Sequence, residues 1–129
     1  MRGIRILFVA AALASTVAGC ARTGGAYNTG SAQPAARAVT VSVQNDYMLA
    51  MDIYAVASGN STRLGSVSPG MHETLVLDPA LMPDGLVQLV ARPAGGGRTI
   101  GTGTLNPQAG QTIDWHIDFN PENSRVTIR

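Results

Sequence analysis

The sequence predicts an all-β domain, a small antiparallel two-sheet sandwich of about seven or eight strands over residues 39–129. From Val39 onward, short apolar or alternating runs are separated about every eight to twelve residues by Gly, Pro, Asn and Asp. No segment in this range has the length and 3.6-residue apolar period of a helix that would compete with these strands. A chain of 129 residues has room for one such domain and little else.

The first two predicted strands alternate between apolar and polar residues. In "VTVSVQN", residues 39–45, the three valines share one face of the strand and the polar side chains share the other. "YMLAMDIYAVA", residues 47–57, ends at the turn "SGNS". This strand is expected to place four apolar residues on one side: Leu49, Met51, Ile53 and Ala55.

The next two strands are less regular. In "TRLGSV", residues 62–67, Leu64 and Val67 are out of period-two register, which predicts a bulge at Gly65. The turn "SPG" leads into "ETLVLD", residues 73–78. One helical turn is expected around Pro79 to Met82.

A hairpin is predicted to follow. "LVQLVARP", residues 86–93, has Val87, Leu89 and Ala91 on the core side. The tip "AGGG" connects it to "RTIGTGTL", residues 98–105, whose glycines predict a weak strand at a sheet edge.

The clearest alternation is in "TIDWHIDF", residues 112–119. One face is predicted to be buried and comprises Ile113, Trp115, Ile117 and Phe119. The turn "NPENS" then leads to a last short strand, "RVTIR". The pattern resembles the small immunoglobulin-like β-sandwich modules of bacterial envelope proteins, although the Cys–Trp–Cys spacing of true immunoglobulin domains is absent from the sequence.

The first 19 residues have the parts of a bacterial secretory signal. "MRGIR" is cationic, and "ILFVAAALASTVAG" is an apolar run of about fourteen residues that ends in small side chains. This run is shorter than the roughly 20 apolar residues that a membrane-spanning helix needs. Residues 1–19 are therefore predicted to form a helical signal peptide rather than a permanent transmembrane anchor.

The segment "VAGC", Val17 to Cys20, resembles the lipobox of bacterial lipoproteins. The resemblance implies that signal peptidase II cuts between Gly19 and Cys20 and that the Cys20 thiol carries diacylglycerol. Two or more acyl chains anchor a protein stably, whereas a single chain does not. Ala21, which is not aspartate, implies sorting to the periplasmic face of an outer membrane. The alternatives are an ordinary signal peptide with an incidental cysteine, or an intermolecular disulfide, because a single cysteine has no partner within its own chain.

Between the signal and the domain, the composition predicts a tether. Residues 21–38, "ARTGGAYNTGSAQPAARA", have almost no large apolar side chains and cannot bury enough surface to offset their ordering entropy. Residues 20–38 are therefore interpreted as the lipidated cysteine and a disordered, flexible linker with a reach of roughly 20 to 25 Å. This length would hold the folded domain close to the membrane.

The charge balance argues against nucleic acid as a partner. The chain has nine basic residues, all of them arginine, and eight acidic ones. Arg2 and Arg5 belong to the signal, which leaves seven arginines against the eight acidic residues from Cys20 onward. Phosphate binding needs clustered cations, and this balance predicts none.

Three groups of side chains are candidates for chemistry or binding. Asp114, His116 and Asp118 alternate on one strand face and form a plausible metal-ligand set, although a solvated polar face has the same pattern. His72 and Glu73 are adjacent, so they point to opposite faces of a strand, and no nucleophile motif accompanies them. The third group is a possible partner patch of tyrosine, valine and arginine: Tyr54, Val56, Arg63, Arg92 and Arg98.

Two functional hypotheses follow. The first is a non-enzymatic, lipid-anchored envelope lipoprotein that binds or scaffolds another envelope component and uses no cofactor. Its first candidate for strand addition is the edge Arg98 to Leu105. The alternative is a small envelope domain that binds a metal or ligand on the Asp114, His116 and Asp118 face. No motif in the sequence specifies a catalytic activity.

Overall fold

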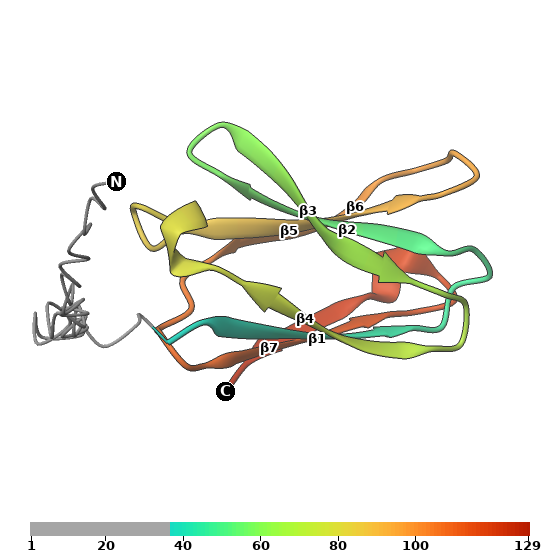
Figure 1. The fold of residues 1–129 in the computed structure, drawn as a ribbon. Helices are drawn as coiled ribbons and strands as arrows, with labels where there is room; N and C mark the ends of the chain where they lie inside the picture. Colours follow the sequence, from blue (N-terminus) through green and yellow to red (C-terminus); the bar gives the residue numbers. More distant parts are fainter. Residues whose placement is uncertain (1–36) are drawn as a thin grey trace, which may run out of the picture. The chain divides into compact units, whose positions relative to one another are not determined.

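The computed structural model describes residues 37–129, which contain two four-stranded sheets (Figure 1). The predicted signal peptide, Cys20 and the linker up to residue 36 lie outside the described residues. No helix between residues 37 and 129 is long and apolar enough to cross a membrane. In chain order the strands are β1 (Val39–Asn45), β2 (Met51–Ala57), β3 (Asn60–Val67), β4 (His72–Leu77), β5 (Val87–Pro93), β6 (Ile100–Leu105), β7 (Thr112–Ile117) and β8 (Arg125–Ile128).

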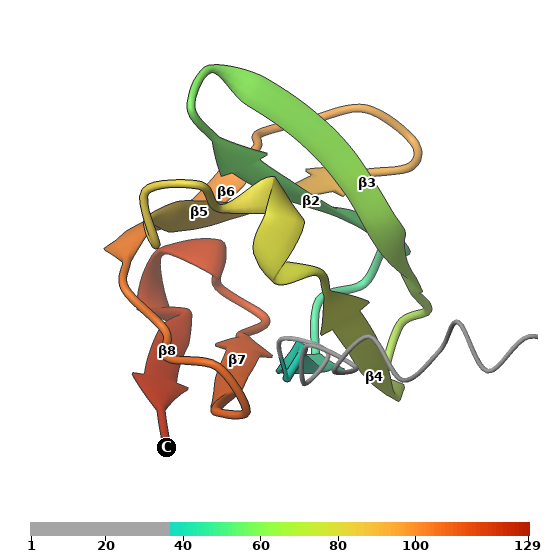
Figure 2. The same ribbon diagram turned by 60° about the vertical axis from the view of Figure 1, so that its left-hand side comes forward.

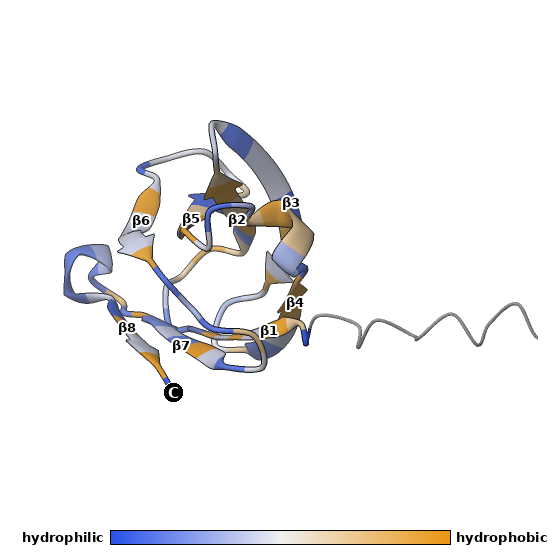
Figure 3. Ribbon diagram, turned by 90° about the vertical axis from the view of Figure 1, so that its left-hand side faces the viewer, coloured by the Kyte–Doolittle hydropathy of each residue, from blue (hydrophilic) through white to orange (hydrophobic). Residues whose placement is uncertain are grey.

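The two sheets form the predicted sandwich. One sheet, here called sheet A, has the strand order β4-β1-β7-β8, and the other, sheet B, has the order β3-β2-β5-β6. Figure 3 views the layers end-on and shows β3 and β4 at one flank, with β6 and β8 at the other. The predicted all-β sandwich is therefore confirmed. Every described strand pair is antiparallel except β1 and β7, which are parallel.

The core comes from the period-two alternation of the strands. Strands β1 and β2 both alternate strictly between buried and half-buried residues, because successive side chains point to opposite faces of a sheet. The inward residues of β5 and β7 complete the interior, as the sequence predicts, with Trp115 only 2% exposed. Burial of these aliphatic and aromatic side chains is the main stabilising term of a domain without a disulfide.

The structure corrects two predictions about side chains at strand ends. Leu49 lies in a bend before β2 and is half-buried, because that strand begins at Met51. Phe119 is 65% exposed, because β7 ends at Ile117 and the chain turns into the loop before residue 119. Alternation predicts the facing of a side chain only as far as the strand itself extends.

The predicted irregularities are present. β2 and β3 shift register so that Ile53 pairs with Gly65 and Tyr54 pairs with Arg63, which leaves Leu64 as the extra residue of a bulge. A Cβ at Gly65 would stand 2.6 Å from Leu75 Cδ2, so this glycine lets β3 approach β4 closely. The expected helical turn is a 3₁₀ helix, η2 (Pro79–Leu81), capped by Asp78, whose side chain accepts from Ala80 N at 2.8 Å.

Candidate functional site

The outer face of sheet A is mostly polar, apart from Val76 on its edge strand β4, and contains both histidines of the chain. Strand register aligns His72 with Gln44, Gln44 with His116 and His116 with Arg125 across the four strands. The next outward row is also polar throughout and consists of Thr74, Ser42, Asp114 and Thr127. The sequence-predicted residues Asp114 and His116 therefore lie on a solvated sheet face with polar neighbours on both sides.

Each histidine has its own hydrogen-bond partner. Ser42 Oγ lies 2.7 Å from His72 Nε2, and His116 Nε2 lies 2.6 Å from Asp46 Oδ2. The seryl and aspartyl groups thus contact different imidazoles and do not form one relay. Both imidazoles and Asp46 are exposed and Ser42 is half-buried, whereas general acid–base catalysis requires a proton held within reach of a positioned substrate.

On this face, Asp46 is an acidic residue whose pKa is lowered by its neighbours. Its carboxylate accepts from Gln44 Nε2 at 2.7 Å, and this hydrogen bond is the main cause that lowers the pKa of Asp46 below its ordinary value. The hydrogen bond from His116 lowers the pKa further. Hydrogen bonds to the charged form favour ionisation, so Asp46 stays a carboxylate at neutral pH.

The three residues of the predicted metal-ligand set do not come together. Asp114 makes an ion pair with Arg129, His116 contacts Asp46, and Asp118 lies beyond the end of β7 and accepts from Asn120 N. Within residues 37–129, no group of three His, Cys, Asp or Glu side chains is placed to hold a metal ion. The alternating spacing in the sequence is explained here by the solvated strand face.

Part of the predicted partner patch gathers on the outer face of sheet B. The Arg92 guanidinium lies over the Tyr54 ring, 4.5 Å from its centroid, and Arg63 donates to Asp52 at 2.7 Å. Arg98 is not part of this group, because it lies at the flank between the sheets. This face therefore has an aromatic surface and two arginines, the residue types enriched at protein interfaces.

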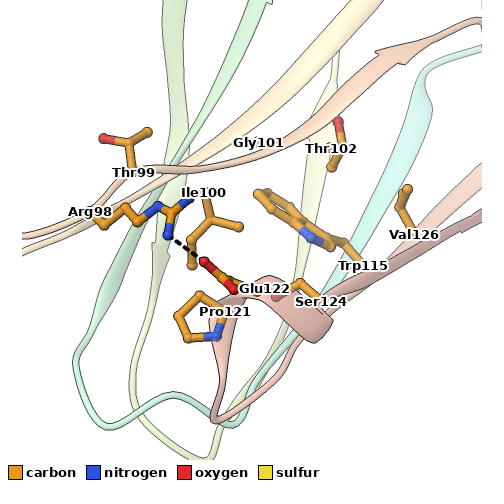
Figure 4. Close-up of a pocket in the computed structure, with 10 residues that line it drawn as sticks. All are labelled: Arg98, Thr99, Ile100, Gly101, Thr102, Trp115, Pro121, Glu122, Ser124 and Val126. Atoms are coloured by element: carbon orange, nitrogen blue, oxygen red, sulfur yellow. Dashed lines mark hydrogen bonds and ion pairs between the residues drawn. The ribbon is translucent and has the colours of Figure 1, made fainter.

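A groove opens at the flank between β6 and β8 and is the candidate site for a bound segment (Figure 4). It has a volume of about 250 Å³. Ile100 and Trp115, both buried, form its apolar inner wall, while Ser124 supplies a hydroxyl. At the mouth, Arg98 from the loop before β6 is ion-paired with Glu122, which belongs to the 3₁₀ helix η3 (Pro121–Asn123).

The pairing of the edge strand β6 with β5, beside this groove, is interrupted by a bulge. Its position at the edge of sheet B confirms the sequence prediction. The register with β5 shifts between Gln88 and Val90, and at this irregularity the Leu89 N–H donates to Thr102 Oγ1 at 3.0 Å. Gly103 has φ +76°, a left-handed conformation. Bulges at sheet edges obstruct the continuous pairing that strand addition requires, so regular pairing along all of Arg98 to Leu105 is disfavoured.

Sequence reasoning missed Asp46, Ser42 and Glu122 as members of these sites. The first two are brought to the histidines by β1, which lies between β4 and β7 in sheet A. These contacts depend on the order of the strands in sheet A, and the order of strands in a sheet cannot be read from a single sequence. A Pro-Glu pair after Asn120 did indicate a turn, but nothing in the chain indicated that this turn reaches Arg98.

Comparison with known proteins adds a structural likeness and no family. No protein-family model matches the chain, and no curated protein matches it. Among solved structures it is similar to a protein from Eubacterium rectale determined by NMR, with 13% identity, coverage of 75% of this chain and 93% of that chain, and a TM-score of 0.42.

Proposed function

We propose that this protein is a non-enzymatic, lipid-anchored lipoprotein of the bacterial envelope, and that its sandwich binds another envelope component. The resemblance of "VAGC" to a lipobox supports the anchor at Cys20. The polar pairs on sheet A, in which Ser42 and Asp46 contact different histidines, support binding over catalysis. No cofactor is required for this role.

The groove between β6 and β8 is the observation that best supports binding. It combines an apolar inner wall with hydroxyl groups and a charged mouth, the mixture by which binding sites gain both affinity and orientation. The Arg98–Glu122 pair at its mouth is exposed, with side-chain accessibilities of 77% and 65%, so separating the pair costs little. A bound segment would exchange this pair for its own polar contacts.

Capture from cells tests the proposal. The full-length protein is crosslinked in the cell and purified beside its Glu122→Arg variant, which places a second cation next to Arg98 at the mouth of the groove. A matched variant is Asp52→Arg, because Asp52 also forms an ion pair with an arginine but lies on the outer face of sheet B. We expect a specific envelope partner that the Glu122→Arg variant loses and the Asp52→Arg variant keeps.

Two results would contradict parts of this proposal. Equal capture by both variants would exclude the groove, and loss in Asp52→Arg alone would assign binding to the face that bears Tyr54 and Arg92.

For the anchor, the Cys20→Ser variant is compared with wild type after membrane fractionation and lipid labelling. We expect lipid incorporation only in the wild type, and a wild type without incorporated lipid would refute the anchor.

A further inference from the structure

The free edge of β4 presents an unpaired row of backbone hydrogen-bonding groups. Within the described part of the chain, β4 pairs with β1 alone and lies at the margin of sheet A (Figure 2). Asn45 N donates to Met71 O at 3.0 Å, which shows that residue 71 directs its backbone toward β1. Directions alternate along an antiparallel strand, so His72, Thr74 and Val76 direct their N–H and C=O groups to the free side.

The other three sheet edges are each protected against pairing. β3 has the bulge at Leu64, and β6 has the bulge and the left-handed Gly103. β8 has only four residues, begins with Arg125 and is followed by Arg129. In contrast, β4 pairs with β1 in unbroken register from His72 to Leu77 and has neither proline nor lysine nor arginine.

Apolar side chains are exposed along the same edge. Val76 is 66% exposed and Met71, directly before β4, is 52% exposed, which makes them two of the large hydrophobic residues most open to solvent in the described domain. A strand that paired with β4 would cover both. Exposed apolar groups beside an unpaired regular edge are the features expected of a strand that takes up another strand.

We infer that the occupant of this edge is β4 of a second copy of this chain, paired antiparallel about a two-fold axis through Thr74. In this register Thr74 faces Thr74 of the partner subunit, a favourable cross-strand pair of β-branched residues. His72 faces Val76 of the partner subunit, and Met71 faces Leu77 of the partner subunit. The three residues with free backbone groups pair with one another, and the exposed Val76 gains a cross-strand neighbour.

Charge disfavours one of the neighbouring registers. A shift that pairs His72 with Thr74 of the partner subunit would place Glu73 directly opposite Glu73 of the partner subunit, and like charges in direct opposition are destabilising. With Thr74 on the axis, Glu73 instead faces Leu75 of the partner subunit at an exposed rim. The self-pairing is isologous, so it closes after two copies and joins two sheets A into one continuous sheet.

Disulfide crosslinking of the full-length protein in its membrane tests the inference. Residues opposite each other in such a pair have Cα atoms about 5.5 Å apart, within the range that a disulfide spans. The folded domain has no cysteine of its own, so Thr74→Cys adds a single thiol to it. We expect mild oxidation to give a covalent dimer with Thr74→Cys. The matched control is Thr104→Cys on the edge strand β6, and we expect it to stay at the wild-type background.

Sedimentation of the detergent-solubilised full chain gives a second readout. Thr74→Pro removes an N–H that points to the free edge and leaves the ladder with β1 complete, so we expect a folded protein whose dimer dissociation constant rises about tenfold or more. Thr104→Pro, also at an edge position, is expected to keep the wild-type value. A wild type that sediments as a monomer throughout the concentration series, with equal crosslinking at residues 74 and 104, would overturn the inference. A Thr74-dependent crosslink to a different protein would also overturn it.

Discussion

Asn45 is the buried polar residue that joins the two sheets at one end of the sandwich. It is fully buried, its Nδ2 donates to Leu49 O at 2.9 Å and to Val67 O at 3.0 Å, and its Oδ1 accepts from Tyr47 N at 3.1 Å. These bonds connect the end of β1 to the loop that follows it and to the end of β3. A buried amide with three partners stabilises one arrangement of these segments, because each alternative leaves polar groups unpaired.

We expect Asn45→Ala to destabilise the domain by roughly 2 to 4 kcal/mol, because it leaves a buried carbonyl, a part-buried carbonyl and one N–H without their partner. Urea denaturation followed by circular dichroism measures the loss. Gln44→Ala is the matched control, because Gln44 is adjacent but lies on the solvated face of the same strand. A loss no greater than that of Gln44→Ala would show that water or backbone shifts replace the amide.

Asp46 predicts a pH dependence of stability on the acid side. The pKa of Asp46 is lowered in the folded protein, chiefly by the hydrogen bond from Gln44 and then by the one from His116. A lowered folded-state pKa contributes stability that is present above the unfolded value of about 4 and is lost as the pH falls through the folded value. Asp46→Asn should therefore flatten the decline of unfolding free energy below pH ~4, and an unchanged slope would contradict this role.

At the level of single residues, the sequence contained part of this information. Alternation from Val39 places residue 45 inward, so an asparagine there already indicates a buried polar group that needs partners. Its partners, Leu49 O and Val67 O, could not be predicted, because the sequence does not show that the loop before β2 and the end of β3 lie beside the end of β1. The contact between Asp46, one residue past β1, and His116 on β7 was unpredictable for the same reason.

Among the elements, β6 shows how a glycine-rich strand is held at a sheet edge. Gly103 has φ +76° and no atom within 4 Å of an added Cβ, so its requirement for glycine is conformational and not steric. The left-handed residue lets Thr102 turn its hydroxyl to Leu89 at the bulge. The composition of "IGTGTL" predicted a weakened edge strand, but the position of the bulge needed the register with β5.

We expect Gly103→Ala to cost about 1 to 2 kcal/mol of unfolding free energy, since a side chain disfavours the left-handed region. Gly95→Ala is the matched control in the β5–β6 turn: it also has open space around it but lacks a positive φ, so it should be neutral or slightly stabilising. Thermal unfolding of both variants measures the difference. Equal effects at residues 95 and 103 would mean that the bulge relaxes without strain.

For the whole molecule, alternation and turn spacing were sufficient to predict a β-sandwich but not its topology. Sheet A combines strands from both ends of the domain, and its central pair, β1 and β7, is parallel. Alternation reports only which side of a strand is buried, so it does not distinguish parallel from antiparallel neighbours. The groove at the β6–β8 flank was unpredictable from the sequence for this reason, since it depends on which strands end up at the edges.

The same topology predicts that the two sheets unfold together. The β1–β7 pair closes a loop of chain that includes all four strands of sheet B, and both sheets share one core. Sheet A therefore gains little stability before sheet B is present, which favours a single cooperative transition and slow folding on a millisecond to second scale.

The one tryptophan of the chain, Trp115, lies in sheet A and reports its packing by fluorescence, while far-ultraviolet circular dichroism reports both sheets. We expect the two signals to give the same urea midpoint in the wild type and to shift together in Gly103→Ala, which alters only sheet B. A fluorescence midpoint that stays in place while the dichroism midpoint moves would show that the sheets are energetically separate.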